Sequence, residues 1–272
     1  MSHFKFPSIK EYYHFQRIND PTLYVFEKVD GANVSLRKER GNIVPWSRGG
    51  AIKGRDRYYF QQFMAYVYEG LSPGIFDLPD NLIPFGEFTH SEFGHILYDN
   101  EHLGKLFLIG IYDSDASLFL SPEKAWEWVE LMGLEEKIGR TPLVREGSID
   151  RNTARKLLRE SKLYTGPPEG LVLHQYDQKY PNGVRMTKVY HSQFQEIDPS
   201  KEGVERYLTL KRFIKAGQKS LANTGSVSFD SIVSETVSDV LFESGREEDE
   251  RSIRRIILPK YEDVVRGVLK HF

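Results

Sequence analysis

The chain has 272 residues, a net charge of −2 at pH 7 and no cysteine. The absence of cysteine excludes disulfide bonds, thiolate metal ligands and a cysteine nucleophile. Hydrophobic residues make up 39% of the chain, enough to bury a core, and no apolar run is long enough to span a membrane. We therefore expect a cytoplasmic protein in which any binding of nucleic acid depends on a local basic groove.

Short strands and helices alternate over the first part of the chain. Apolar and alternating runs predict strands at 23–27, 33–37, 43–45, 82–88, 106–112, 170–174 and 184–189. Helical spacing predicts helices at 55–69, 121–132 and 149–161. Ser121 suits the N-cap of the second helix, with Pro122 in its first turn and Gly133 ending it. This order predicts a mixed, largely antiparallel α+β domain at 1–199.

The pattern changes after Pro199. Helical spacing runs through 201–221, 229–243, 247–257 and 261–271, with short polar loops between these segments. We therefore predict a small helical domain at 200–272.

The segment Glu27-Lys28-Val29-Asp30-Gly31 ends an apolar strand at a glycine turn. A lysine amine is a nucleophile only when it is unprotonated, so its ordinary pKa of about 10.4 must be lowered by cations or by burial. A lysine at the end of a strand is held on a rigid element that faces a cleft. Taken alone, the same residues also fit an ordinary solvated hairpin.

Further motifs follow this lysine in a fixed order. They are Ser47-Arg48-Gly49-Gly50, Phe85-Gly86-Glu87-Phe88, the apolar run 106–113, Glu169-Gly170-Leu171-Val172-Leu173, and Arg185-Met186-Thr187-Lys188. Each motif alone is weak, but in this order and spacing they resemble the covalent nucleotidyltransferase superfamily, which contains polynucleotide ligases and mRNA capping enzymes. The connecting segments 95–99, 133–134, 141–144 and 168–170, together with Ser161, resemble RNA ligases in particular.

The resemblance implies an α+β fold: an antiparallel-sheet nucleotidyltransferase domain of the ATP-grasp-like ligase type at 1–199, with a small all-α domain at 200–272. It implies ATP as substrate and Mg²⁺ or Mn²⁺ as cofactor. Lys28 would take AMP from ATP, AMP would pass to the 5′-phosphate of an RNA end, and a 3′-hydroxyl would displace it. The implied partners are RNA ends, and an end-healing kinase or phosphatase stays open as a further partner.

The resemblance also assigns contacts to the nucleotide. Arg48 contacts ribose or a phosphate oxygen, Glu87 a ribose hydroxyl, and Lys188 the α-phosphate. Glu27 is counted among the nucleotide-binding residues. Phe107 stacks on adenine or, as an aromatic residue in an apolar strand, belongs to the core.

The same resemblance gives roles to carboxylates near the lysine. Glu169 holds the metal or a metal-bound water, and Asp30 is the second metal candidate. Asp30 and Asn33 orient a metal-bound water or the attacking hydroxyl. His95 and His174 have no second histidine at ligand spacing, so we expect structural roles for them.

One position departs from the fifth motif. A second cation is usual two residues before the lysine, where this chain has Met186. Arg185 is adjacent but would point to the opposite face of the strand, unless a bulge turns it inward. Lys53 is the other candidate for the missing phosphate contact, and a slow or degenerate adenylyltransferase is an alternative.

The C-terminal helices favour an RNA ligase over its relatives. DNA ligases and capping enzymes follow the fifth motif with a β-rich OB-fold domain and an Arg-x-Asp-Lys motif, and neither is found here. The alternatives are a DNA-end ligase, a capping-type nucleotidyltransferase, or a catalytically decayed module that binds nucleotide or RNA. The helical domain offers basic residues that form either an RNA-backbone contact or an ordinary solvated face: Lys211, Arg212, Lys215 and Lys219.

Overall fold

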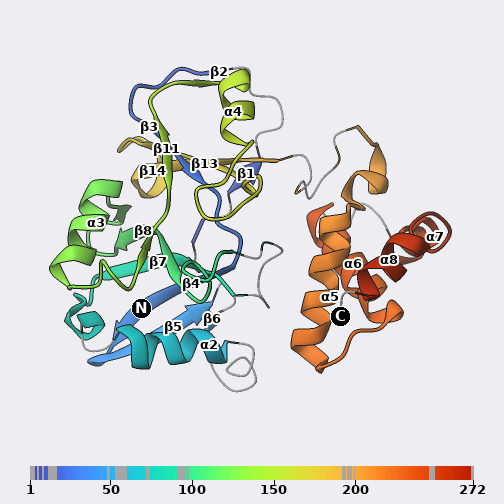
Figure 1. Cartoon of the computed structure of the whole chain (residues 1–272), viewed down its shortest axis with the longest axis horizontal. Coiled ribbons are helices and arrows are strands. Elements are labelled where there is room, and N and C mark those ends of the chain that lie inside the picture. The colour runs from blue at the N-terminus through green and yellow to red at the C-terminus, as the bar shows by residue number, and fades with distance from the viewer. Residues whose placement is uncertain are drawn as a thin grey trace. The chain divides into compact units, whose positions relative to one another are not determined.

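The computed structural model describes residues 4, 6–7, 9–11, 17–47, 50–52, 60–71, 74–90, 96, 98–191, 194, 198, 200–244 and 249–270. The chain divides into two compact units, Met1–His191 and Ser192–Phe272, and each is described by itself (Figure 1). The domain boundary expected after residue 199 stays a prediction. Among the described residues, every helix is too short or too polar to span a lipid bilayer.

The larger sheet of the first unit is built around the central strand β7 (Leu82–Phe88). Within the described residues its strands run in the order β10-β8-β7-β4-β5-β6, with β9 also paired to β8. The pairs are antiparallel except for β10 on β8. The other strands are β4 (Ala32–Glu39), β5 (Asn42–Ser47), β6 (Gly50–Ala51), β8 (Leu106–Asp113), β9 (Leu118–Phe119) and β10 (Gly139–Arg140).

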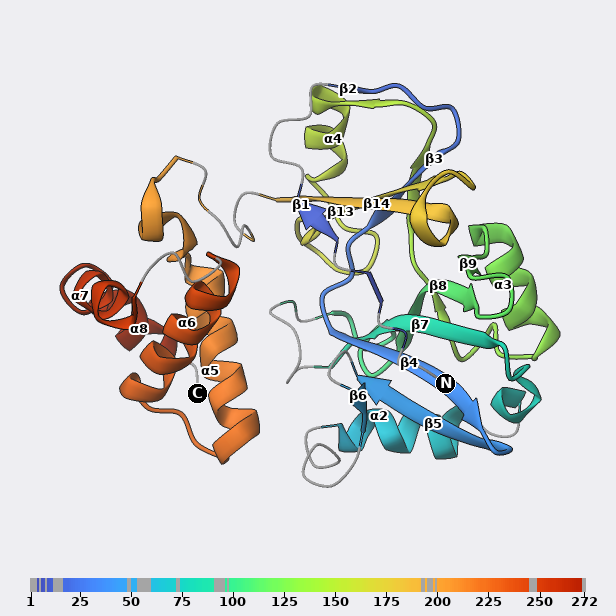
Figure 2. The ribbon, with the colours of Figure 1, turned by 180° about the vertical axis from the view of Figure 1, so that it is seen from behind.

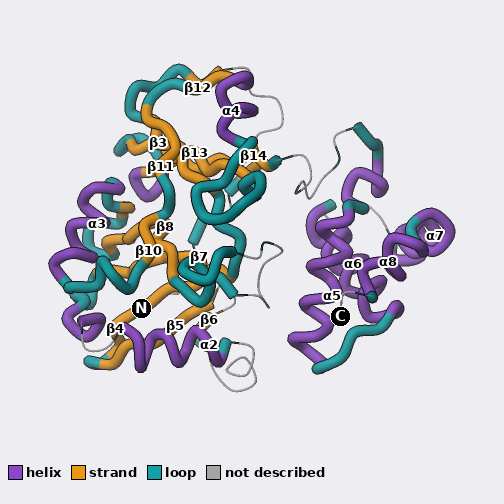
Figure 3. Tube along the Cα trace, in the orientation of Figure 1, coloured by secondary structure: helices purple, strands orange, loops and turns teal. Residues whose placement is uncertain are grey.

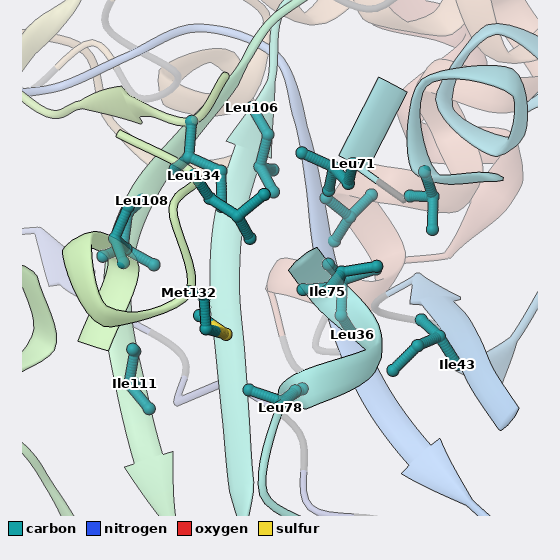
Figure 4. Packing of buried hydrophobic residues seen from close by; sticks show 14 of the residues in the cluster. Leu36, Ile43, Leu71, Ile75, Leu78, Leu106, Leu108, Ile111, Met132 and Leu134 are labelled. Carbon is teal, nitrogen blue, oxygen red and sulfur yellow. The ribbon is translucent and has the colours of Figure 1, made fainter. Parts of the chain in front are cut away.

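Helical segments cover one face of the larger sheet. They are α2 (Gln61–Ala65), the π-helical turn η1 (Tyr66–Leu71), the 3₁₀ turn η2 (Gly74–Asp77) and α3 (Pro122–Leu131). Apolar side chains such as Leu36, Leu71 and Leu106 pack there into the main core (Figure 4). Because side chains alternate along a strand, the opposite face of this sheet carries the other residues of β4, β7 and β8.

The smaller sheet of the first unit has the strand order β1-β14-β13-β3-β11 within the described residues. It lies above the larger sheet in both views of the ribbon (Figures 1 and 2). Its outer face packs on α4 (Arg151–Leu157) through Val25, Leu173 and Ala154. The strands are β1 (Lys10–Glu11), β3 (Leu23–Glu27), β11 (Leu143–Glu146), β13 (Gly170–Tyr176) and β14 (Val184–Tyr190), while β2 (Arg17–Ile18) pairs with β12 (Ile149–Asp150).

An aromatic cluster joins the inner faces of the two sheets. Phe85 and Tyr112 of the larger sheet lie in this cluster with Met186 of the smaller sheet. Phe4 stacks on Tyr112 with ring centroids 3.7 Å apart, and Phe6 lies 5.3 Å from Phe85. The cluster fixes one end of the space between the sheets, and the charged motif residues lie on the same two inner faces.

The described part of the second unit is helical (Figure 3). It contains η5 (Gly203–Tyr207), α5 (Leu210–Thr224), α6 (Phe229–Glu243), α7 (Glu250–Lys260) and α8 (Glu262–Leu269). Its core is formed by apolar residues such as Phe213, Val237 and Ile257. The side chains of Thr209, Ser228 and Asp249 cap α5, α6 and α7 and so define where these helices begin.

Most predicted elements agree with the structure, and two differ. The predicted helix 149–161 begins at Arg151, because the Asp150 side chain accepts the Thr153 N–H at 2.7 Å as N-cap, and it ends at Leu157. The predicted helix 201–221 is divided into η5 and α5, because Thr209 caps a new helix. Residues 55–59 of the predicted helix 55–69 lie outside the described residues.

Candidate active site

Lys28 lies at the end of β3 on the inner face of the smaller sheet. Its N–H donates to the Gly170 carbonyl at 2.9 Å, which extends the pairing of β3 with β13 to this residue. Its Nζ donates to Glu169 Oε2 at 2.6 Å. Glu169 is 1% exposed and Lys28 19% exposed, so the pair is largely shielded from solvent.

The turn after Lys28 is anchored by a segment distant in sequence. The Asp30 N–H donates to the Tyr98 hydroxyl at 2.6 Å, and the Ile96 N–H donates to the Asp30 carboxylate at 3.1 Å. Gly31 is required because a Cβ there would lie 2.5 Å from the Phe88 carbonyl oxygen. The lysine is therefore held on a strand end that is fixed on both sides. Tyr98 was not predicted as a site residue, although it lies in the segment 95–99 that resembles RNA ligases.

Asn33, Glu87 and Phe107 form a row across three strands of the larger sheet. Asn33 pairs with Glu87 and Glu87 with Phe107, so the three side chains share the inner face. Asn33 Nδ2 lies 3.5 Å from Glu87 Oε2. Phe107 is buried, but its neighbours Leu106 and Leu108 point into the main core on the other face. Its ring lies against Gly139, where a Cβ would come within 2.7 Å.

The Glu27 side chain points to the opposite face from Lys28. Its carboxylate accepts hydrogen bonds from the Ser161 hydroxyl and, at 2.8 Å, from the Lys162 N–H. These bonds hold the loop that leads from α4 to Glu169. Both carboxylate oxygens of Glu27 are therefore engaged in loop contacts, and its predicted contact with nucleotide stays a prediction. Ser161 belongs to the connecting residues that resemble RNA ligases, but the resemblance gave it no role.

Lys188 lies on β14, on the same inner face as Lys28. Its Nζ donates to the Tyr190 hydroxyl at 3.0 Å and lies 4.8 Å from the centre of the Tyr190 ring. Lys28 Nζ lies 5.6 Å from the centre of the same ring. Tyr190 was not predicted as a site residue, although its position two residues after Lys188 places it on the same strand face.

Carboxylates dominate the electrostatics around Lys28. Burial alone would lower the pKa of Lys28, but Glu169, Glu87 and Asp30 outweigh it and raise this pKa above its ordinary value. The expectation of a lowered lysine pKa is thus wrong for the protein by itself. Burial, together with Glu169 and Asp30, raises the pKa of Glu87 to about 7, although Lys28 and Asn33 oppose the shift.

Replacing Glu87 by glutamine is expected to stabilise the protein more at high pH than at low pH. The pKa of Glu87 is about 7 in the folded state and 4.5 ordinarily, so the wild-type protein loses stability as pH rises between these values. Glutamine does not ionise, so the substitution should raise the free energy of unfolding by roughly 1–3 kcal/mol above pH 7. Thermal unfolding at about pH 5 and about pH 8 measures the difference. An equal effect at both pH values, or the same effect from the exposed Glu127→Gln control, would contradict the prediction.

Comparison with known proteins gives the family. The model of the RNA ligase family matches residues 21–190 of the chain. The chain belongs to the RNA ligase family. No curated protein matches the sequence of this chain.

Solved structures of an RNA ligase from Naegleria gruberi resemble this chain in fold. A lysine-to-alanine variant of Naegleria gruberi RNA ligase with ATP and Mn has a TM-score of 0.50 and 19% identity. A lysine-to-methionine variant with AMP and Mn gives the same values, and each match covers 70% of the present chain and 58% of the other. The likeness confirms the predicted α+β fold. The present chain spans little more than half of the length of these chains, 58% in each match.

The departure at Met186 has a structural explanation. Met186 packs against the aromatic cluster between the sheets, and these apolar surroundings suit methionine better than a cation. Strands β13 and β14 pair without a bulge from Gly170 to Tyr176, so Arg185 is exposed and faces away from Lys188. The idea that Arg185 turns inward through a bulge is therefore wrong.

Four other residues were considered from the sequence, and the structure describes one of them, His174. Arg48, Lys53 and His95 lie outside the described residues. His174 is buried between aromatic side chains, with its ring centre 5.1 Å from that of Phe26, and burial lowers its pKa to about 4. It stays neutral near pH 7 and has the structural environment that was expected.

The donor set fits a divalent cation held mainly by a nucleotide. Among the described residues, no group of three or more His, Asp or Glu side chains could hold a metal by itself. Mg²⁺ commonly takes one or two carboxylates and completes its coordination with phosphate oxygens and water. Asp30, Glu87 and Glu169 all lie near enough to Lys28 to raise its pKa, so carboxylate ligands for a cation are present at this place.

Some of the basic residues of α5 are engaged within the helical unit. Lys219 forms an ion pair with Asp239, and Arg212 Nε donates to the Tyr207 carbonyl at 2.7 Å. Lys219 is exposed, as on a solvated helix face, whereas Arg212 is 3% exposed. Binding of RNA by this helix stays a prediction.

Proposed function

We propose that this RNA ligase joins RNA ends with ATP, through an AMP group bound covalently to Lys28. The observation that carries the proposal is the Lys28–Glu169 pair at 2.6 Å, held on the inner face with Glu87 and Asp30 around it. A lysine fixed at a strand end and largely shielded from water suits a nucleophile that must be aimed at one phosphorus atom. The Naegleria structures with ATP or AMP and Mn support the choice of nucleotide and cofactor.

In the first step Lys28 Nζ attacks the α-phosphorus of ATP. A bond forms between nitrogen and phosphorus, the bond from that phosphorus to the bridging oxygen breaks, and pyrophosphate leaves. The ammonium group must first lose a proton, and positive charge placed beside the three carboxylates would lower its pKa again. Mg²⁺ or Mn²⁺, when bound, supplies such charge, and Asp30 and Glu169 are the residues that we propose to hold it. Lys188 offsets negative charge on the α-phosphate.

The inner face of the larger sheet supplies the remaining contacts. Glu87 would accept a hydrogen bond from a ribose hydroxyl, with Asn33 beside it, and Phe107 in the same row would stack on adenine. In the second step AMP passes from Lys28 to the 5′-phosphate of an RNA end. In the third, a 3′-hydroxyl attacks that phosphate and AMP leaves. Both later steps depend on positioning and on neutralising charge at the same place.

Incubation with ATP labelled at the α-phosphate, together with Mg²⁺ or Mn²⁺, tests the proposal. We expect a covalent label on the protein, located on Lys28 by peptide mapping. Labelled GTP is the control for a capping-type enzyme. Comparing the sealing of nicked RNA with that of nicked DNA distinguishes an RNA ligase from a DNA ligase. If the protein takes no label at any pH between about 6 and 9, the proposal fails and a catalytically decayed binding module is indicated instead.

A further inference from the structure

Tyr190 lies between the two lysines of the site. Its ring centre is 5.6 Å from Lys28 Nζ and 4.8 Å from Lys188 Nζ, and its hydroxyl accepts a hydrogen bond from Lys188 Nζ at 3.0 Å. The residue is 5% exposed, so its ring is almost completely enclosed. Two ammonium groups that repel each other are thus gathered at one aromatic ring.

The strand pairing fixes the position of this tyrosine. Tyr190 is directly opposite Gly170, and the next residue, His191, donates its N–H to the Glu169 carbonyl at 3.0 Å. A Cβ on Gly170 would lie 2.4 Å from the Val189 carbonyl oxygen, so the two strands approach each other closely here. The backbone that carries Tyr190 is therefore held against the backbone that carries Glu169, the ion-pair partner of Lys28.

The chemistry of a tyrosine suits both contacts. The face of an aromatic ring carries partial negative charge and attracts ammonium groups, while the hydroxyl can accept one of their hydrogen bonds. A long lysine side chain has many rotamers, and a buried partner restricts them. This matters most at Lys188, because the position where a second cation is usual holds Met186, which packs into the aromatic cluster.

We propose that Tyr190 is a positioning residue for transfer of AMP to Lys28, with its ring holding Lys28 and its hydroxyl orienting Lys188. This inference rests on the proposed function, because it assigns the tyrosine to that reaction. Lys28 is held by the ion pair with Glu169 and by the nearby ring of Tyr190. Lys188 is held through the hydroxyl, so that its charge is directed to the phosphate that Lys28 attacks.

A double-mutant cycle on the full chain tests the contact between hydroxyl and Lys188. Tyr190→Phe removes one hydrogen bond from a charged group and should slow labelling of Lys28 by roughly tenfold at saturating ATP. Lys188→Met should slow it by roughly a hundredfold. The double variant should be no slower than Lys188→Met alone, because the hydroxyl then has no lysine to orient.

The contribution of the ring is measured with a second substitution. Tyr190→Leu should be slower than Tyr190→Phe by roughly three- to tenfold, since phenylalanine keeps the aromatic face and leucine does not. Tyr180→Phe and Tyr180→Leu are matched controls, because Lys179 Nζ lies 5.0 Å from the centre of the Tyr180 ring outside the site. Circular dichroism checks that the variants are folded. If Tyr190→Leu does not fold, the double-mutant cycle with Tyr190→Phe still tests the inference.

The outcomes separate this inference from the proposed function. If wild-type protein is labelled and Tyr190→Phe is labelled at the same rate, the role of the hydroxyl is wrong. If the effects of Tyr190→Phe and Lys188→Met multiply in the double variant, the tyrosine acts only through general stability. If wild-type protein takes no label, the proposed function fails, and the inference fails with it.

Discussion

Replacing Lys28 by arginine is expected to abolish the covalent AMP adduct while the protein stays folded. Arginine keeps a positive charge beside Glu169 and can still donate hydrogen bonds to it, so the buried carboxylate keeps its partner. A guanidinium group does not lose its proton in proteins and cannot act as the nucleophile. Loss of a nucleophile typically lowers a rate by about a thousandfold or more. Labelling with α-labelled ATP, followed by electrophoresis, measures the change.

The control for this experiment is another lysine in a short ion pair. Lys179 Nζ lies 2.6 Å from Asp177 on the surface, away from the inner faces of the sheets, so Lys179→Arg should be labelled like the wild type. Circular dichroism and thermal unfolding should be close to wild type for both variants. A label that persists in Lys28→Arg would show that the nucleophile is a different residue.

Replacing Gly170 by alanine is expected to destabilise the first unit and to slow labelling of Lys28. The new Cβ would lie 2.4 Å from the Val189 carbonyl oxygen and 3.1 Å from Tyr190 Cα, so β13 and β14 would have to separate. Backbone atoms in a paired strand cannot move as a flexible side chain can, and we expect a loss of roughly 3 kcal/mol. For a unit of this size the melting temperature should fall by about 10 °C.

The effect on labelling follows from the neighbours of Gly170. Glu169 precedes it in the chain and Tyr190 is opposite it in the sheet, so separating the strands moves both residues that contact Lys28. Gly70→Ala in η1 is the matched control, because its Cβ would meet only a Tyr66 ring atom at an ordinary 3.7 Å. It should change stability by less than about 1 kcal/mol. Equal effects of the two substitutions would contradict the close approach at Gly170.

Local sequence patterns predicted the elements whose signals are local. The predicted strand 82–88 and the predicted helix 229–243 coincide with β7 and α6. A strand buried on both faces appears in the sequence as a continuous apolar run. A helix whose N-cap is a serine begins at the residue after that serine. The short strands β1, β2, β9 and β12 have two residues each and leave no periodic signal, so only their pairing partners define them.

The charge state of the site could not be obtained from the sequence. Glu169 is 141 positions from Lys28 and Glu87 is on a different sheet, so their effect on the lysine depends on how the two sheets pack. The motif alone suggested a lowered lysine pKa, whereas the carboxylates gathered by the fold raise it. The opposite directions of the Glu27 and Lys28 side chains likewise follow from strand pairing rather than from residue type.

The sequence by itself determined the motif order, and with it the family, the identity of Lys28 as candidate nucleophile, and the strands that carry Glu87 and Lys188. These depend on residue identity and on short-range periodicity. Only the tertiary structure decided that Met186 belongs to an aromatic cluster, that Arg185 faces away, and that Tyr190 lies between the two lysines. The physical reason is that a side chain's partners are set by sheet register and by the packing of one sheet on the other, which no local pattern encodes.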